Sequence, residues 1–175
     1  MCCIPKLMRI SSISTLMKIS MDEHFVQQAL ALASQAFAAN EVPIGCVIAH
    51  NGEIIGAGFN LRNTKKNTLY HAEIIAIDRA SEVLGDWRLE DCTLYVTVEP
   101  CPMCAGAILQ ARIPRLVYGA ANPKAGAVGS VVNLLNNPAF NHQVQVVSGI
   151  MEAECAGLMT EFFKKFRKNN DHISL

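Results

Sequence analysis

Two short motifs, about thirty residues apart, constrain this chain most, because their side chains form a site only if the fold brings them together. The first is His71-Ala72-Glu73, and the second is Pro100-Cys101-Pro102-Met103-Cys104. A spacing of three places Cys101 and Cys104 on one face of a first helical turn. Pro102 suits such a turn, since an early helical N–H has no partner within the helix. The positive end of that helix favours thiolates, which are the metal-binding form of cysteine.

One imidazole and two thiolates are a ligand set typical of catalytic zinc. No fourth Cys or His lies at ligand spacing near His71, so one coordination position is left for water. Positions two apart in a helix do not share a face, so Glu73 is not expected to bind the same ion side by side with His71. We therefore predict one Zn²⁺ per subunit, held by His71, Cys101 and Cys104, with Glu73 as the catalytic acid and base.

Other interpretations of the cysteine pair are weaker. A C-x-x-C pair alone is as common in structural zinc sites and redox motifs. A redox dithiol needs neither His71 nor Glu73, and the second half of a structural zinc knuckle is absent from the sequence. H-x-E followed by P-C-x-x-C is instead the signature of zinc-dependent nucleobase deaminases.

The composition fits one globular domain. The 175 residues are 51% hydrophobic and 17% charged, which is enough for one core and unlike a disordered chain. A formal net charge of zero neither requires nor excludes nucleic acid, because local patches matter more. Seven cysteines follow no disulfide pattern, and a thiolate zinc site indicates a reducing compartment, so we expect the cytoplasm. No apolar run approaches the roughly 20 residues that span a membrane, so no membrane association is expected.

Residues 1–20 differ in character from the rest. They contain Lys6, Arg9, Lys18 and four serines but no acidic residue. A targeting peptide has such a composition, and a disordered extension is the simpler interpretation. We favour the extension and place a single zinc deaminase domain at residues 21–170.

Hydrophobic periodicity predicts an α/β fold. Helices are expected at 22–40 with Asp22 as N-cap, at 71–84 with Ile74, Ile77 and Leu84 inward, from about 102 to 112, at 131–135 and at 152–168. Strands are expected at 44–49 and 54–59, joined by an Asn51-Gly52 hairpin turn, and at 93–98, 115–119 and 144–147. This alternation favours a parallel or mixed sheet covered on both faces, with the site beyond the strand ends.

Residues 22–168 resemble the bacterial tRNA-specific adenosine deaminases of the cytidine deaminase-like superfamily. The zinc motifs alone are shared by many deaminases. The tRNA branch is favoured by Lys124-Ala125-Gly126-Ala127, by Gly129-Ser130 and by Phe162-Phe163. The resemblance also rests on the segments 41–45, 58–60, 93–108, 115–120, 141–142 and 149.

The resemblance implies a cytidine deaminase-like, three-layer α/β/α sandwich around a five-stranded mixed sheet. It implies a homodimer that binds a tRNA anticodon stem-loop and converts the wobble adenosine of an arginine tRNA to inosine. Carried over by position, His71, Cys101 and Cys104 hold zinc, and Glu73 shuttles protons. Substrate contacts are expected at Asn60, Ala72, Asn122 and Phe163.

Two segments depart from the family pattern. Asn67-Thr68-Leu69-Tyr70 replaces the usual Asp-Pro-Thr-Ala before the histidine, and Asn122 replaces an aspartate. Near a nucleic-acid backbone, an amide in place of a carboxylate removes repulsion of phosphate, and we hypothesise that it relaxes discrimination between RNA and DNA. Near the C-terminus the basic cluster Lys164, Lys165, Arg167 and Lys168 can contact phosphates or form an ordinary solvated helix face.

The sequence leaves two rival functions open. A deaminase of free guanine or cytosine, or of their nucleosides, would use the same zinc and Glu73 in a closed pocket without a basic groove. A catalytically silent zinc module that binds RNA would not require Glu73.

Overall fold

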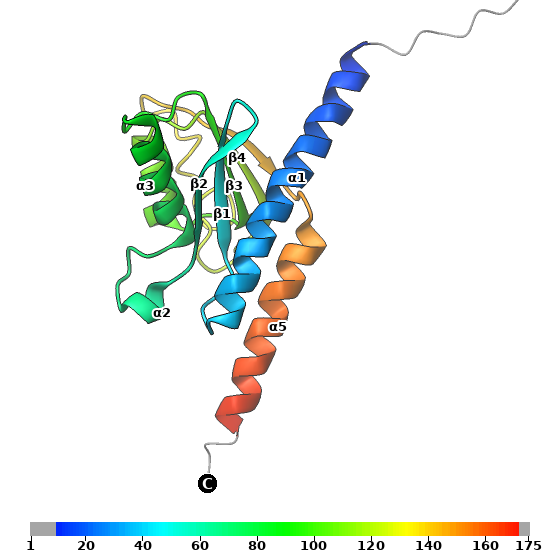
Figure 1. Cartoon of the computed structure of the whole chain (residues 1–175), viewed down its shortest axis with the longest axis vertical. Helices are drawn as coiled ribbons and strands as arrows, with labels where there is room; N and C mark the ends of the chain where they lie inside the picture. The colour runs from blue at the N-terminus through cyan, green and yellow to red at the C-terminus, as the bar shows by residue number, and fades with distance from the viewer. Residues whose placement is uncertain (1–9, 172–175) are drawn as a thin grey trace, which may run out of the picture.

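The computed structural model describes the backbone of residues 10–171 and the side chains of residues 21–167. Its centre is a five-stranded sheet of order β2-β1-β3-β4-β5 (Figure 1). β1 (Gly45–His50) runs antiparallel to β2 (Glu53–Phe59) and to β3 (Cys92–Val98). β4 (Arg115–Ala120) and β5 (Gln145–Ser148) continue the sheet in parallel with β3. The predicted α/β class and the mixed sheet are confirmed.

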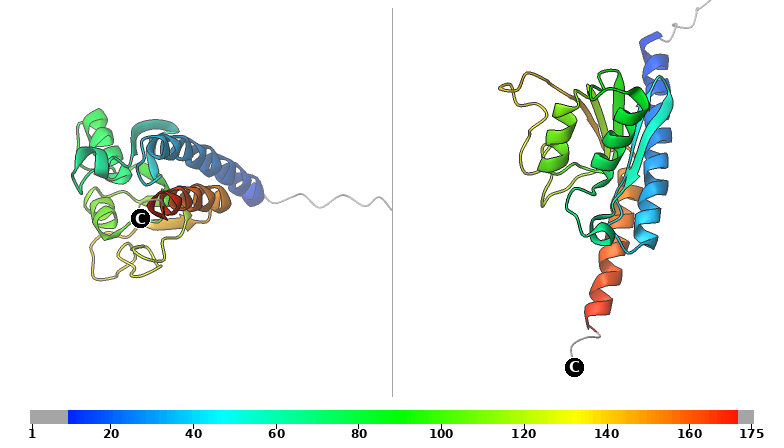
Figure 2. Two further views of the ribbon diagram at one scale, coloured as in Figure 1. Left: turned by 90° about the horizontal axis from the view of Figure 1, so that it is seen from below. Right: turned by 60° about the vertical axis from the view of Figure 1, so that its left-hand side comes forward.

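Helices cover both faces of the sheet. α1 (Ile10–Ala38) and α5 (Glu152–Asp171) lie on one face, whereas α3 (Ala72–Leu84) and α4 (Pro102–Gln110) lie on the other (Figure 2). Neighbouring strand residues point to opposite faces, so Val47 packs under α1 and Ile48 packs under α3 and α4. Each face therefore has its own apolar core, and the predicted three-layer sandwich is confirmed.

The hairpin between β1 and β2 forms as predicted. Asn51 and Gly52 both have positive φ, at 51° and 84°, as the favoured two-residue hairpin turn requires. This turn lies at the end of the hairpin opposite Phe59 and Asn60, because Gly45 pairs with Phe59 and His50 pairs with Glu53.

α3 lies against β2 through small side chains. Its fully buried apolar residues are Ala72, Ala76 and Ala80. Ile77 is half-buried and packs against the same core as expected, whereas Leu84 is 37% exposed, so its expected inward position was wrong. A Cβ at Gly56 or Gly58 of β2 would clash with the backbone of α3. This close approach fixes the first turn of α3 against the sheet.

α1 begins at Ile10, well before the expected start at Asp22. No Pro or Gly interrupts the chain between residues 10 and 38, so nothing ends the helix upstream. Asp22 therefore lies within the helix, and its buried carboxylate accepts two hydrogen bonds from the Arg115 guanidinium at 2.8 and 2.7 Å. Residues 10–20, expected to be disordered, are helical, and residues 1–9 lie outside the described part.

The segment 131–135 is not a helix. Val128 and Asn133 form an isolated antiparallel bridge, and the Leu134 N–H donates to the Ala127 carbonyl. Backbone pairing within the loop and burial of Leu135 hold this segment in a non-helical form. A four-residue helix, α2 (Arg62–Lys65), forms in the predicted polar loop. Within residues 10–171, no helix combines the length and apolar character needed to cross a bilayer.

Candidate active site

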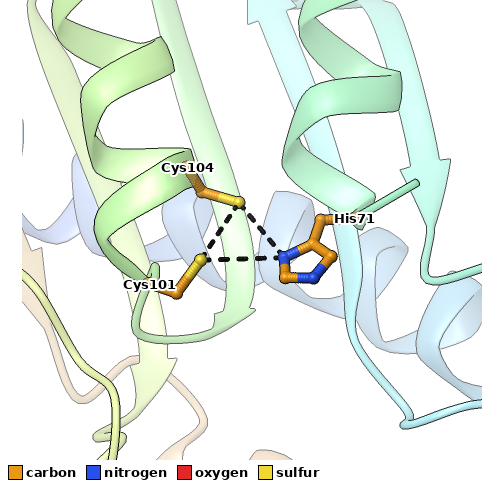
Figure 3. A group of neighbouring side chains, drawn as sticks. All are labelled: His71, Cys101 and Cys104. Carbon is orange, nitrogen blue, oxygen red and sulfur yellow. Dashed lines mark hydrogen bonds between the residues drawn. The ribbon is translucent and has the colours of Figure 1, made fainter. Parts of the chain in front are cut away.

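Three side chains expected to bind metal converge between the starts of α3 and α4. His71 Nδ1 lies 3.7 Å from Cys101 Sγ and 3.5 Å from Cys104 Sγ, and the two sulfurs are 3.7 Å apart (Figure 3). In the described part of the chain, they are the one group of three or more His, Cys, Asp or Glu side chains close enough to share an ion. The fold thus brings together the two motifs on which the sequence prediction rested.

The local backbone explains this convergence. His71 and Cys101 are the N-cap residues of α3 and α4, and both have extended backbone angles. Pro102 occupies the start of α4 as expected, and Cys104 lies within its first turn. α4 directly follows β3, so both cysteines lie beyond the carboxyl end of a central strand.

The triangle has the size of a tetrahedral zinc site. Ligand bonds of about 2.3 Å to sulfur and about 2.0 Å to nitrogen place the sulfurs about 3.8 Å apart and each sulfur about 3.5 Å from the nitrogen. The observed separations agree with both values. Hydrogen bonds that the Cys101 sulfur accepts from Cys104 and His71 lower its pKa to about 4, although burial acts in the opposite direction, and this favours the metal-binding thiolate form.

Glu73 is a buried carboxyl group beside the triangle. Its side chain is 3% exposed, and its Oε2 atom has no hydrogen-bond partner among the residues that the structure describes. Burial raises the pKa of Glu73, so the group takes up a proton more readily than an exposed glutamate. An unpartnered buried oxygen is costly unless another molecule completes its hydrogen bonding. The site therefore fits a metal ion with a water molecule and a polar substrate beside it.

A small pocket of about 100 Å³ opens next to His71 and Glu73. Asn60 and Ala72, two of the residues expected to contact substrate, line this pocket. Asn60 is held by its backbone N–H, which donates to the Ile44 carbonyl at 3.0 Å.

An apolar groove of about 500 Å³ adjoins this pocket and shares Val42 and Ile44 with it. Asn122 and Phe163, the other two expected contacts, line the groove together with Lys124. Phe163 is 46% exposed, whereas its neighbour Phe162 is buried as expected. The Asn122 Oδ1 atom accepts a hydrogen bond from the Ala125 N–H, so this side chain also stabilises its own loop.

The basic residues of α5 do not act as one patch. Lys165 donates to the Asn40 side chain at 3.0 Å and lies over the Phe37 ring, on the α1 side of the helix. Arg167 borders a second hollow, of about 460 Å³, that it shares with Lys124 and Phe163. The side chain of Lys168 lies outside the described residues. Arg167 is thus the member of this cluster that the structure places beside the groove.

Sequence reasoning missed the role of Glu99, a buried residue at the end of β3. Its carboxylate accepts hydrogen bonds from the backbone N–H groups of Asn122, Val128 and Ser130 at 2.9, 3.0 and 3.0 Å, and from the Ser130 hydroxyl. Burial raises the pKa of Glu99, but these bonds outweigh burial and lower it. A Cβ at Gly126 would clash with this carboxylate. An acidic residue directly after a largely buried strand was the available signal, because a buried carboxylate needs donors.

Glu41 was the second omission. It is fully buried between α1 and β1, and it accepts hydrogen bonds from the Asn60 side chain and the Thr64 N–H. Two buried carboxylates therefore hold the two loops that border the pocket and the groove. Their donors come from distant parts of the chain, so the sequence does not reveal the pairing.

Comparisons with known proteins show the family of this chain. Residues 20–167 match the family model of MafB19-like deaminases. The tRNA-specific adenosine deaminase of Bacillus subtilis (strain 168) is 49% identical over 150 residues, which cover 86% of this chain and 93% of that protein. The enzyme of the same name from Streptococcus pyogenes serotype M1 is 47% identical over 154 residues, which cover 87% and 90% of the two chains.

Two solved structures share the fold of this chain. A structure from a study of A-to-I editing by tRNA:A34 deaminases has a TM-score of 0.74 and 45% identity, and the match covers 77% of this chain and 98% of that one. A guanine deaminase from Nitrosomonas europaea shares the fold at a TM-score of 0.67, with 23% identity over 80% of this chain and 83% of that one. With nearly half of its residues identical to the bacterial enzymes over most of both lengths, this chain belongs to the family of tRNA-specific adenosine deaminases.

Proposed function

We propose that this deaminase hydrolyses the wobble adenosine of a tRNA anticodon to inosine, with an arginine tRNA as its substrate. The observation that carries the proposal is the buried, unpartnered Oε2 atom of Glu73 beside the His71–Cys101–Cys104 triangle. The tRNA is inferred from the activity named for the bacterial relatives and for the structural neighbour.

The triangle would hold zinc through His71 Nδ1 and the sulfurs of Cys101 and Cys104. When bound, zinc supplies the Lewis acidity that makes water nucleophilic near neutral pH. The ligand separations and the thiolate character of Cys101 support this assignment.

Glu73 would move the protons of the reaction. It takes a proton from the attacking water and places it on N1 of adenine, which makes C6 electrophilic as the water oxygen adds there. It then carries the second proton from that oxygen to the departing amino group. One adenosine and one water thus give one inosine and one ammonia. The raised pKa of Glu73 suits a group that must hold a proton between these steps.

The groove beside the pocket would bind the nucleotides that flank the target. Phe163 offers an exposed ring on which a base can stack, while Lys124 and Arg167 offer positive charge to phosphates. Bases in an anticodon loop are accessible without opening a duplex, so presenting the adenosine to the pocket costs little.

We also propose a homodimer that works in the cytoplasm. The dimer is carried over from the family resemblance, and the cytoplasm follows from thiolate ligands that need reducing conditions. Sedimentation equilibrium of the zinc-loaded protein tests the dimer, and a monomer at micromolar concentration would contradict it.

The rival functions fit the site less well. A deaminase of free bases would be expected to enclose its substrate, whereas this pocket adjoins a groove lined by Lys124, and Arg167 borders the second hollow beside it. A silent RNA-binding module would gain nothing from a buried carboxyl group without a partner.

Incubation of the purified protein with total tRNA, followed by mapping of inosine, tests the proposal. We expect inosine at the wobble position of an arginine tRNA. An absence of inosine from every wobble position, together with ammonia release from free guanine, would overturn the proposal and favour the free-base deaminase.

A further inference from the structure

Glu41 has an unusual position for an acidic residue, because it is fully buried at the edge of the pocket. Its Oε2 atom accepts a hydrogen bond from Asn60 Nδ2 at 3.4 Å, and its Oε1 atom accepts one from the Thr64 N–H at 2.5 Å. Thr64 belongs to α2, the short helix whose first residue, Arg62, lines the same pocket. One carboxylate from the end of the α1 layer thus holds two parts of the pocket wall.

The carboxylate also decides which way the Asn60 amide faces. Asn60 Nδ2 donates to Glu41 Oε2, so the NH₂ group of the amide faces Glu41. The amide oxygen then faces away from Glu41, and Asn60 lines the pocket together with His71 and Glu73. Glu41 thereby gives the pocket a hydrogen-bond acceptor at a fixed place.

Adenosine within RNA has few donors that such an acceptor can recognise. The ring nitrogens N1, N3 and N7 are acceptors, and the amino group is the leaving group at the reacting end. The 3′ and 5′ oxygens of the ribose are esterified in the chain. The 2′-hydroxyl is the donor that remains, and it is also the group that distinguishes RNA from DNA.

We propose that Glu41 is a positioning residue that orients the Asn60 amide so that its oxygen accepts a hydrogen bond from the 2′-hydroxyl of the target adenosine. The inference rests on the proposed activity toward RNA. It predicts that Glu41 and Asn60 contribute to a preference for ribose over deoxyribose at the target nucleotide. The zinc chemistry cannot provide this preference, because the reacting atoms of the base are the same in both sugars.

A pair of isosteric substitutions tests the orientation. In Glu41→Gln, the amide oxygen at position 41 is needed as the acceptor for the Thr64 N–H, so the NH₂ group faces the Asn60 NH₂ group. Asn60 must then turn its oxygen toward position 41 and away from the substrate. In Asn60→Asp, two carboxylates face each other. In the double variant, the amide at position 41 donates to the carboxylate at position 60 and still accepts from the Thr64 N–H. That carboxylate again presents an oxygen to the pocket, and the double variant has the same net charge as the wild type.

The assay measures kcat and KM on an anticodon stem-loop RNA and on the same RNA with a single 2′-deoxyadenosine at the target position. Each single variant is expected to lower kcat/KM on the all-RNA substrate by about 10- to 100-fold, mainly through KM, while the double variant returns to within about threefold of the wild type. Glu82→Gln, an exposed substitution on α3, is the charge-removal control. Zinc content and melting temperature are measured for every variant.

The deoxy substrate gives a second readout that needs no variant. The wild type is expected to lose about 10-fold or more in kcat/KM on it, and the single variants are expected to show little further loss. A double variant no better than the weaker single variant would overturn the inference, as would a wild type that processes both substrates equally. A wild type inactive on the all-RNA stem-loop would instead overturn the proposed function itself.

Discussion

The metal corner, which consists of His71, Cys101 and Cys104, and the rim of loops around it are held in place in different ways. His71, Cys101 and Cys104 lie on the starts of two helices that pack directly on the sheet, so regular structure fixes them. The rim consists of the loops at residues 61–70 and 121–130, and each is attached to the core by one buried carboxylate, Glu41 or Glu99. Under the proposed function, we expect reaction chemistry to depend on the helices and the choice of substrate to depend on these few hydrogen bonds.

Removing a metal ligand should have the largest effect. His71→Ala is expected to lose bound zinc, all deaminase activity and part of its thermal stability, because Cys101 and Cys104 are left without their third partner. His50→Ala, at the far end of the hairpin, is the matched control. Metal analysis of the purified proteins gives the zinc content, and a variant that keeps a full equivalent of zinc would exclude His71 as a ligand.

Glu73→Gln should separate chemistry from metal binding. We expect kcat to fall by about 10²- to 10⁴-fold, because the amide cannot carry protons, while zinc content stays at the wild-type value. Glu82→Gln, exposed on the same helix, should retain full activity. Activity of Glu73→Gln close to the wild type would show that another group moves the protons.

Glu99→Gln should loosen one side of the rim and leave the metal corner intact. The amide loses an acceptor for the 121–130 loop, so we expect a loss of about 1.5–3 kcal/mol in stability and a higher KM for tRNA, with zinc retained. The pKa of Glu99 is lowered on folding, so this loss is complete above the ordinary pKa of an unfolded glutamate and shrinks as pH falls through the folded-state pKa. Denaturant unfolding at several pH values measures it, and an equal loss at all pH values would contradict the assignment.

Phe163→Ala should act on the groove alone. Loss of a base-stacking ring is expected to raise KM for an anticodon stem-loop by about fivefold or more, without a change in zinc content. Phe140→Ala removes a ring of similar exposure, which lies outside the groove lining, and serves as the control. Equal effects of the two substitutions would argue against stacking on Phe163.

Asn122→Asp should have the smallest effect. The carboxylate can still accept the Ala125 N–H, so stability should be unchanged, but the added charge repels phosphate and should raise KM about two- to threefold at low salt. Rates on matched RNA and DNA stem-loops test whether discrimination also changes. The hypothesis of relaxed discrimination fails if the RNA-to-DNA ratio is the same for both proteins.

The metal corner could be predicted from sequence because local rules determine it. The C-x-x-C spacing places two thiols on one face of a helical turn, Pro102 suits the first helical position, and His71 directly precedes a predicted helix. The five strands and the Asn51-Gly52 turn followed from similarly local patterns.

The rim could not be predicted in the same way. Glu41 and Glu99 find their partners through tertiary contacts, and the alanine face of α3 reflects the glycines of β2 on another element. Asp22 looked like an N-cap because its buried partner Arg115 is far away in sequence. These residues are polar or small for reasons that only the assembled fold supplies.

The most direct test of the account is deamination of an arginine tRNA in H₂¹⁸O, followed by mass spectrometry of the wobble nucleoside. Hydrolysis by a water activated beside Glu73 predicts inosine that carries one ¹⁸O atom on C6, from the zinc-loaded wild type and not from Glu73→Gln. Unchanged adenosine at the wobble position, or inosine without ¹⁸O, would contradict it.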